Sequence, residues 1–161
     1  MIETQWELLS IFIGGVLSAA FFAGYETGFI SLNPIRVKNL FEKTHSRRAR
    51  ILLNYLDKPD ELLIVLLLGT NFSVVIASIA LSELLGRPFL SLLIATGVVL
   101  YFGEILPKTI FRVHPNSLCY FLVPAVAFFD FIFKPISIPL VWFFSTALGS
   151  NHWFSSLQSL M

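Results

Sequence analysis

Residues 62–82 read LLIVLLLGTNFSVVIASIALS, a run of 21 residues without a charge. About 20 apolar residues in a helix are enough to cross a bilayer core of about 30 Å. Asp60 and Glu61 come directly before the run, where the positive end of a helix dipole favours acidic side chains. The run therefore predicts a membrane-spanning helix over 62–82.

Two more runs of this kind flank the first. One covers residues 8–32 and ends at Asn33-Pro34, because proline disfavours helix at the residue before it. The other covers residues 89–107. Only 13% of the residues are charged, whereas soluble domains have about a quarter. We therefore expect an all-α integral membrane protein with three transmembrane helices, plus cytoplasmic-side juxtamembrane helices, in a single transmembrane domain over 1–161.

Most of the basic residues lie in segment 34–60, after the first span. Its apolar residues recur with a helical period, which predicts amphipathic helices at the membrane surface. Seven of the eleven Lys and Arg residues of the chain lie here: Arg36, Lys38, Lys43, Arg47, Arg48, Arg50 and Lys58. The turn after the second span has one, Arg87. The positive-inside rule then predicts a multi-pass protein of the cell membrane with an external N-terminus and a cytoplasmic C-terminus.

The apolar stretch 117–148 is harder to interpret. Charges at Asp130 and Lys134 divide it, and prolines at 124, 135 and 139 interrupt both halves. Neither half is long enough to span comfortably alone. Two short interfacial or re-entrant helices at the cytoplasmic leaflet are favoured, with one kinked crossing as the alternative.

Several function classes find no support in the sequence. The chain has no nucleic-acid motif, no Ser/His/Asp or Cys/His arrangement and no phosphate loop. The single cysteine, Cys119, rules out a disulfide within the chain. We therefore expect the lipid bilayer as a partner, no nucleic acid, and no enzymatic activity or catalytic residues.

Two carboxylates lie inside the apolar runs, Glu26 and Glu104. A charge at membrane depth costs on the order of 3 kcal/mol on insertion scales, so it commonly marks an ion path or proton relay. The alternative is that each side chain reaches headgroups or caps a helix end. Gly103 and Pro107 flank Glu104 and predict a loosened helix there. Freed carbonyls at this depth are tolerated only where they line a cavity.

The second span has a similar irregularity at Gly69-Thr70-Asn71. The Asn71 amide predicts either a bond between helices or an oxygen close to a metal ion, and Gly69 offers its carbonyl. Small residues repeat every four positions in both spans, which lets helices approach closely and would bring Ser18, Asn71 and Glu104 within reach of one another. Oxygen ligands of this kind suit Mg²⁺, Ca²⁺ or Na⁺ better than zinc or copper.

Three stretches resemble a known family. They are residues 17–27 (LSAAFFAGYET), Ser31-Leu32-Asn33 and residues 103–108 (GEILPK). They are similar to the transmembrane domain of the CNNM/CorC magnesium transporters, and GEILPK is the most specific of them. The resemblance covers essentially the whole chain. It implies three crossings with a short cytoplasmic-side helical belt, a homodimer, and a following cytoplasmic CBS-pair domain that this sequence lacks.

The resemblance also implies a dehydrated Mg²⁺ site. Its ligands would be first-span serine hydroxyls, oxygens of a Gly-Asn segment in the second span, and the signature glutamate. The metal residues expected here are Glu104, Asn71, Gly69, Ser18, Glu26 and Ser31, with Glu26 shaping the field or bonding a helix end. Glu104 and Gly69 match directly, whereas Ser18 and Asn71 are one residue out of register. The chain departs from the pattern at four positions: Ala19, Ala23, Thr70 and Val74.

The expected function is magnesium transport across the membrane, of the efflux type. The resemblance implies sodium exchange as a driving force, so Mg²⁺ and Na⁺ are the expected ions. One alternative is a membrane sensor or scaffold that regulates other ion proteins, with Glu104 capping a broken helix. Another is a transporter for a different cation, because the departures affect the ligand positions.

Overall fold

A computed structural model describes the backbone of residues 2–86 and 88–147 and the side chains of 5–86 and 89–135. Within these ranges every element is a helix, which confirms the all-α prediction: α1 (Ile2–Ile30), α2 (Pro34–Thr44), α3 (Arg47–Asp57), α4 (Pro59–Leu85), α5 (Pro88–Val98), the π-helix η1 (Val99–Ile105), α6 (Leu106–Val113) and α7 (Pro115–Ala147). Arg87 and the last residue of the predicted segment 117–148 lie outside the described residues.

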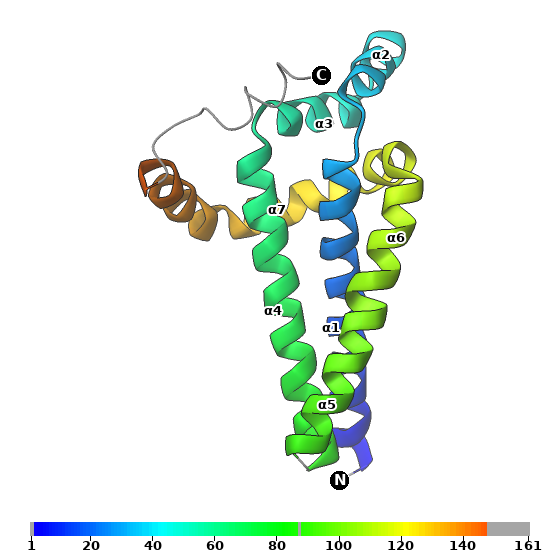
Figure 1. Cartoon of the computed structure of the whole chain (residues 1–161), viewed down its shortest axis with the longest axis vertical. Coiled ribbons are helices and arrows are strands. Elements are labelled where there is room, and N and C mark those ends of the chain that lie inside the picture. Colours follow the sequence, from blue (N-terminus) through cyan, green and yellow to red (C-terminus); the bar gives the residue numbers. More distant parts are fainter. Residues whose placement is uncertain (1, 87, 148–161) are drawn as a thin grey trace.

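Three long helical runs lie side by side along the long axis of the molecule (Figure 1). They are α1, α4 and the continuous run α5–η1–α6. Each contains a segment long and apolar enough to cross a membrane: Gln5–Ile30, Pro59–Leu85 and Phe89–Val113. These three segments agree with the three crossings that the sequence predicts.

The last helix corrects one prediction. Residues 115–147 form a single helix, α7, rather than two short ones, and the helix continues through Pro124 and Pro135. A proline removes one backbone donor and bends a helix without always ending it. Its segment Pro115–Pro135 is also long and apolar enough to cross a membrane, but α7 lies across the other long helices instead of alongside them (Figure 1). A helix across the bundle is compatible with the predicted interfacial placement.

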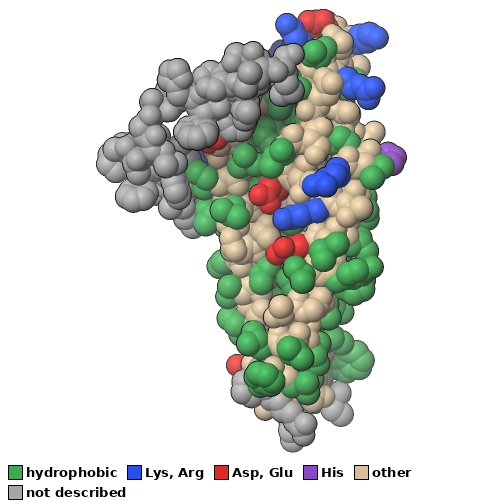
Figure 2. Space-filling model, viewed as in Figure 1, with side chains coloured by type: hydrophobic (Ala, Val, Ile, Leu, Met, Phe, Trp, Pro, Cys, Tyr) green, Lys and Arg blue, Asp and Glu red, His purple; other side chains and the backbone are tan. Residues whose placement is uncertain are grey.

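Helices α2 and α3 lie at the end of the molecule opposite the N-terminus of α1 (Figure 1). The Asn33 side chain caps α2 by accepting a bond from the backbone N–H of Arg36, at 3.2 Å. Lys and Arg side chains gather at the tip of this end, on the face that Figure 2 shows. The basic segment therefore forms one pole of the molecule, as an amphipathic pair of helices.

Hydrogen bonds tie α3 and the turn before it to α7. The Tyr55 hydroxyl donates to Asp130 Oδ2 at 3.2 Å, and the hydroxyls of Ser46 and Tyr120 lie 2.8 Å apart. Burial raises the pKa of the Tyr55 hydroxyl above its ordinary value, and the neighbouring Asp130 charge raises it further. Tyr55 therefore remains a neutral donor to Asp130 and fixes α7 against the basic pole.

Helices α1 and α4 approach closely through their small residues, as the sequence predicts. A Cβ atom on Gly15 would lie 2.9 Å from the Ala77 Cβ, and one on Gly69 would lie 2.7 Å from the Phe22 ring. Phe22 is buried and packs edge-on against Phe129 of α7, with ring centroids 5.0 Å apart. Glycine at position 69 thus lets one aromatic side chain join α4, α1 and α7.

The third run loosens where the sequence predicts it. Residues Val99–Ile105 form a π-helix, and the Leu106 N–H bonds to the Tyr101 carbonyl, five residues back. Pro107 has no N–H, so the turn before it lacks one backbone donor. Short π segments are frequent at functional sites. Glu104 lies within this segment.

Candidate cation site

Two hydroxyls and a carbonyl meet between α1 and α4. The Ser73 hydroxyl lies 2.9 Å from the Ser18 hydroxyl and 2.7 Å from the Gly69 carbonyl oxygen. Ser73 is buried, whereas Ser18 is partly buried. The structure therefore brings two of the predicted site residues, Ser18 and Gly69, to a common partner.

This hydroxyl pair lines a cavity of about 350 Å³. The other lining residues are apolar and come from α1, α4 and α7, among them Phe72, Phe129 and Phe133. None of the described residues that line this cavity is a carboxylate. Its oxygens are neutral, so on their own they could orient water or a weakly held ion but could not neutralise a divalent charge.

The one-residue offset noted in the sequence decides which way Ser18 faces. One residue is about 100° on a helix, so Ser18 faces Ser73 of α4, whereas Ala19 packs against the π segment. A Cβ on Gly103 would lie 3.4 Å from the Ala19 Cβ. Ser18 therefore lies on a different side of α1 from the signature glutamate's segment.

The other departures from the family pattern lie in packed surroundings as well. Ala23 is fully buried, and Val74 packs against a cluster that includes Val99 of η1. The Thr70 hydroxyl is buried and donates to the Leu66 carbonyl at 3.0 Å. At three of the four departing positions (19, 23 and 74) a methyl-bearing side chain thus stands where the family resemblance implies an oxygen-bearing one.

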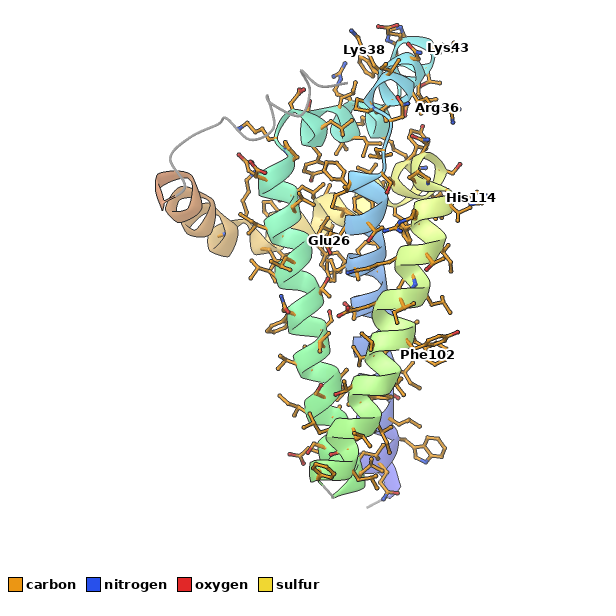
Figure 3. The ribbon with its side chains drawn as sticks, viewed as in Figure 1. Glu26, Arg36, Lys38, Lys43, Phe102 and His114 are labelled. Atoms are coloured by element: carbon orange, nitrogen blue, oxygen red, sulfur yellow. The ribbon has the colours of Figure 1, made fainter. Side chains whose placement is uncertain are left out.

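Glu26 and Glu104 belong to two elements that contact each other, α1 and η1. Figure 3 shows Glu26 on α1 between the ribbons of α4 and α6, and Glu104 belongs to η1, the segment directly before α6. Both side chains are partly buried. Among the described residues, neither carboxylate makes a hydrogen bond or an ion pair. Two unpaired carboxylates at membrane depth are the strongest attraction for a cation in the described part of the chain.

Basic side chains follow Glu104 on the same helical run. Lys108 and Arg112 follow Glu104 at intervals of four residues, so the three side chains form one stripe. Figure 2 shows acidic and basic side chains gathered on this face, with apolar surface on both sides of them. We call Glu26, Glu104, Lys108 and Arg112 the charged face.

Asn71 and Ser31 lie apart from both groups. Asn71 is exposed on α4, and its amide nitrogen donates to the Leu67 carbonyl at 2.9 Å. Ser31 is exposed at the end of α1 and donates to the Thr27 carbonyl at 2.8 Å. Within a single chain, the structure does not bring either of them to Ser18, Gly69 or the charged face.

Three residues of these groups were not among the predicted ligands, Ser73, Lys108 and Arg112, and the first two each had a signal in the sequence. Ser73 follows Gly69 by four residues, so the same helical spacing that marks the close approach of α4 to α1 also places its hydroxyl there. Lys108 is part of the GEILPK stretch, four residues after Glu104. The period of the helix was the signal for both.

Known proteins are similar to this chain along most of its length. The family described as "Cyclin M transmembrane N-terminal domain" (CNNM) matches residues 10–156. A protein of Escherichia coli K12, "UPF0053 inner membrane protein YfjD", is 37% identical over 134 residues, which are 77% of this chain and 29% of that protein. A "UPF0053 protein" of Haemophilus influenzae is 34% identical over 142 residues, which are 84% of this chain and 32% of that protein.

A more distant relative shows the same pattern. "UPF0053 protein MG146" of Mycoplasma genitalium is 29% identical over 183 aligned positions, which cover 96% of this chain and 42% of that protein. The chain therefore spans less than half the length of each of these curated relatives. Its long apolar helices and the inner-membrane relative place it in a membrane.

Proposed function

Since this chain belongs to the CNNM family, we propose that it is the membrane domain of a divalent-cation transporter and that magnesium is its cargo. The observation that carries the proposal is Glu104, a carboxylate that pairs with no described residue and lies in a π-helical segment of a run long and apolar enough to cross a membrane. A charge in such a position is costly unless it serves an ion or a partner charge. Glu26 adds a second carboxylate on the same face.

The ion in this proposal keeps part of its water shell. Mg²⁺ gives up water reluctantly and is usually held by one or two carboxylates together with several waters. The charged face offers two carboxylates, whereas the methyl groups of Ala19, Ala23 and Val74 offer no oxygen. Ser18 and Gly69 instead line the separate hydroxyl-bearing cavity. A partly hydrated ion needs fewer protein ligands than the dry site implied by the family resemblance.

The membrane orientation and the homodimer are parts of the same proposal. The basic pole of α2 and α3 faces the cytoplasm, in agreement with the positive-inside rule. The amide oxygen of Asn71 supports a homodimer, because it is exposed at mid-helix and accepts no bond from a described residue. A second copy packed on this side of α4 would supply the donor that lipid lacks. Sodium as a coupling ion and a following CBS-pair domain also remain proposals.

The test is Mg²⁺ flux into vesicles that contain the purified protein. We expect Glu104→Ala and Glu104→Gln to abolish flux, because both remove the charge, while Glu104→Gln keeps the size. Glu42→Gln is the matched control, since Glu42 is an exposed carboxylate on α2, and its flux should equal that of the wild type. Unchanged flux in Glu104→Gln would refute the role of Glu104.

The same vesicles separate the proposal from its alternatives. The methyl groups at the departing positions favour a cation other than Mg²⁺, because they supply no oxygen ligand. The flux of Mg²⁺, Ca²⁺, Mn²⁺ and Na⁺ is therefore compared. Faster flux of another ion would reassign the cargo. Vesicles that pass none of the four ions, from protein that is folded, would favour the sensor or scaffold.

A further inference from the structure

Lys108 lies at a depth where a cation needs a partner. It belongs to the run Phe89–Val113, which is long and apolar enough to cross a membrane, and it lies five residues before the end of that run. Five residues are about 8 Å along a helix. Its side chain is partly buried and makes no hydrogen bond or ion pair with any described residue. Charged side chains at such positions usually pair with each other.

Glu104 is within reach of Lys108 by a side-chain rotation alone. Residues four apart on a helix have Cβ atoms about 5–6 Å from each other. Glutamate four residues before lysine is also the favourable order for such a pair. The flexible four-carbon stem of lysine lets its ammonium group cover this distance without a backbone movement.

Glu26 is a second partner for Lys108 on the neighbouring helix. A Cβ on Gly24 of α1 would lie 3.2 Å from the Pro107 Cβ of α6. Helices α1 and α6 therefore approach closely at Gly24 and Pro107, two residues from Glu26 and one residue from Lys108. Figure 3 places Glu26 between α4 and α6, and Figure 2 shows acidic and basic groups together on that face. The Lys108 ammonium group thus has a carboxylate on its own helical run, Glu104, and another on the neighbouring helix α1, Glu26, although it lies within ion-pair distance of neither.

We propose that Lys108 is a tethered counter-cation that exchanges with the transported ion. In the empty protein its ammonium group pairs with Glu104. When a divalent cation binds Glu104, the ammonium group moves to Glu26. Glu104 is then neutralised in both states, first by the ammonium group and then by the ion, whereas Glu26 receives the ammonium group only while the ion is bound. This inference rests on the proposed function, because it requires a cation at Glu104.

The exchange weakens binding in a way that helps release. An incoming cation must displace Lys108 and then remains next to its positive charge. Two charges about 6 Å apart still interact appreciably at the effective dielectric near a protein surface. Removing the lysine charge should therefore tighten Mg²⁺ binding by about tenfold and slow the release of the ion.

The experiment measures thermal unfolding of the full-length protein in detergent, first in chelator and then across a Mg²⁺ titration. The variants are Lys108→Met, which keeps length but not charge, and Lys108→Arg, which keeps the charge. Lys38→Met is the control, since Lys38 is exposed on α2. We expect Lys108→Met to melt earlier in chelator and to reach half its Mg²⁺-induced shift at about one-tenth of the wild-type concentration. Lys108→Arg and Lys38→Met should follow the wild type.

Three results would overturn the inference. A lysine with a purely structural role would lower the melting temperature equally in chelator and in Mg²⁺, with no change in the half-saturating concentration. Weaker Mg²⁺ binding in Lys108→Met would show that the lysine assists the ion instead of competing with it. If the wild type itself gives a shift that is lost in Glu104→Gln, Mg²⁺ binding at Glu104, which the proposed function requires, stands even when the Lys108 inference fails. If Mg²⁺ does not change the melting temperature of the wild type, both the Lys108 inference and the proposed magnesium site at Glu104 are refuted.

Discussion

Replacing Gly69 by alanine tests the contact through which α4, α1 and α7 meet. A Cβ at this position would lie 2.7 Å from three atoms of the Phe22 ring, which is much closer than an ordinary contact of about 3.5–4.0 Å between carbon atoms. The ring cannot easily withdraw, because Phe129 and Phe21 pack against it with centroids 5.0 and 5.2 Å away. The added methyl group must therefore displace a packed aromatic side chain.

The size of the effect follows from two opposing terms. Overpacking a tight core costs about 1–3 kcal/mol, and the rigid surroundings of Phe22 place this site at the upper end. Alanine in a helix interior regains about 1 kcal/mol over glycine. The net loss for Gly69→Ala is then about 2 kcal/mol, which corresponds to a fall in melting temperature of roughly 4–8 °C for a chain of this size.

The assay is thermal unfolding of the purified protein in detergent, followed by circular dichroism. Gly97→Ala is the matched control, because Gly97 is also a helical glycine but has no atom within 4 Å of the added Cβ. It should unfold at the same or a higher temperature than the wild type. Phe22→Leu in the Gly69→Ala background should recover part of the loss, since it removes the obstructing ring. If Gly69→Ala were as stable as Gly97→Ala, the proposed joint of three helices would be refuted.

Two further predictions concern the ion site and the dimer. Pro107→Ala restores a backbone donor, so the π segment should relax towards a regular helix and turn Glu104 by up to about 100°. We expect equal or higher thermal stability together with a loss of Mg²⁺ flux, and unchanged flux would show that transport does not need the π segment. Asn71→Cys should form a disulfide-linked dimer on oxidation, because Asn71 is exposed on the surface assigned to the partner, whereas Cys119 is buried. A chain that stays monomeric on a denaturing gel would contradict that interface.

The long helices were predictable because their signal is local. The length of each apolar run can be read directly from the sequence, and a run about as long as the bilayer is thick predicts a crossing. The irregular segment at Glu104 was also visible in advance, since Gly103 and Pro107 weaken a helix wherever they occur. What the sequence alone did not specify was the form of the irregularity, a π-helix, in which Gly103 lies close to Ala19 and Val99.

The candidate site was harder to predict, because it depends on the rotation of each helix. Ser18 and Ala19 are neighbours in sequence, yet one faces Ser73 and the other faces Gly103. A difference of one residue along α1 changes which helix the side chain faces, and a hydropathy pattern does not reveal this difference. For α7, the prolines in the sequence suggested a break, but the structure has one continuous helix. This helix contacts Tyr25 and Tyr55; the Tyr25 hydroxyl, for instance, donates to the Cys119 carbonyl at 3.4 Å.

The position of α1 at the centre of the bundle also bears on how the chain assembles. This helix contacts α4, η1, α6 and α7, yet the ribosome makes it before all four of them, because synthesis proceeds from the N-terminus onward. Until residues 115–135 have been made, Tyr25 and Gly28 lack their α7 neighbour Cys119. Helix α1 is thus made before the helices that enclose it. During that interval its small and polar positions remain open to lipid, or to whatever insertion factor accompanies the nascent chain.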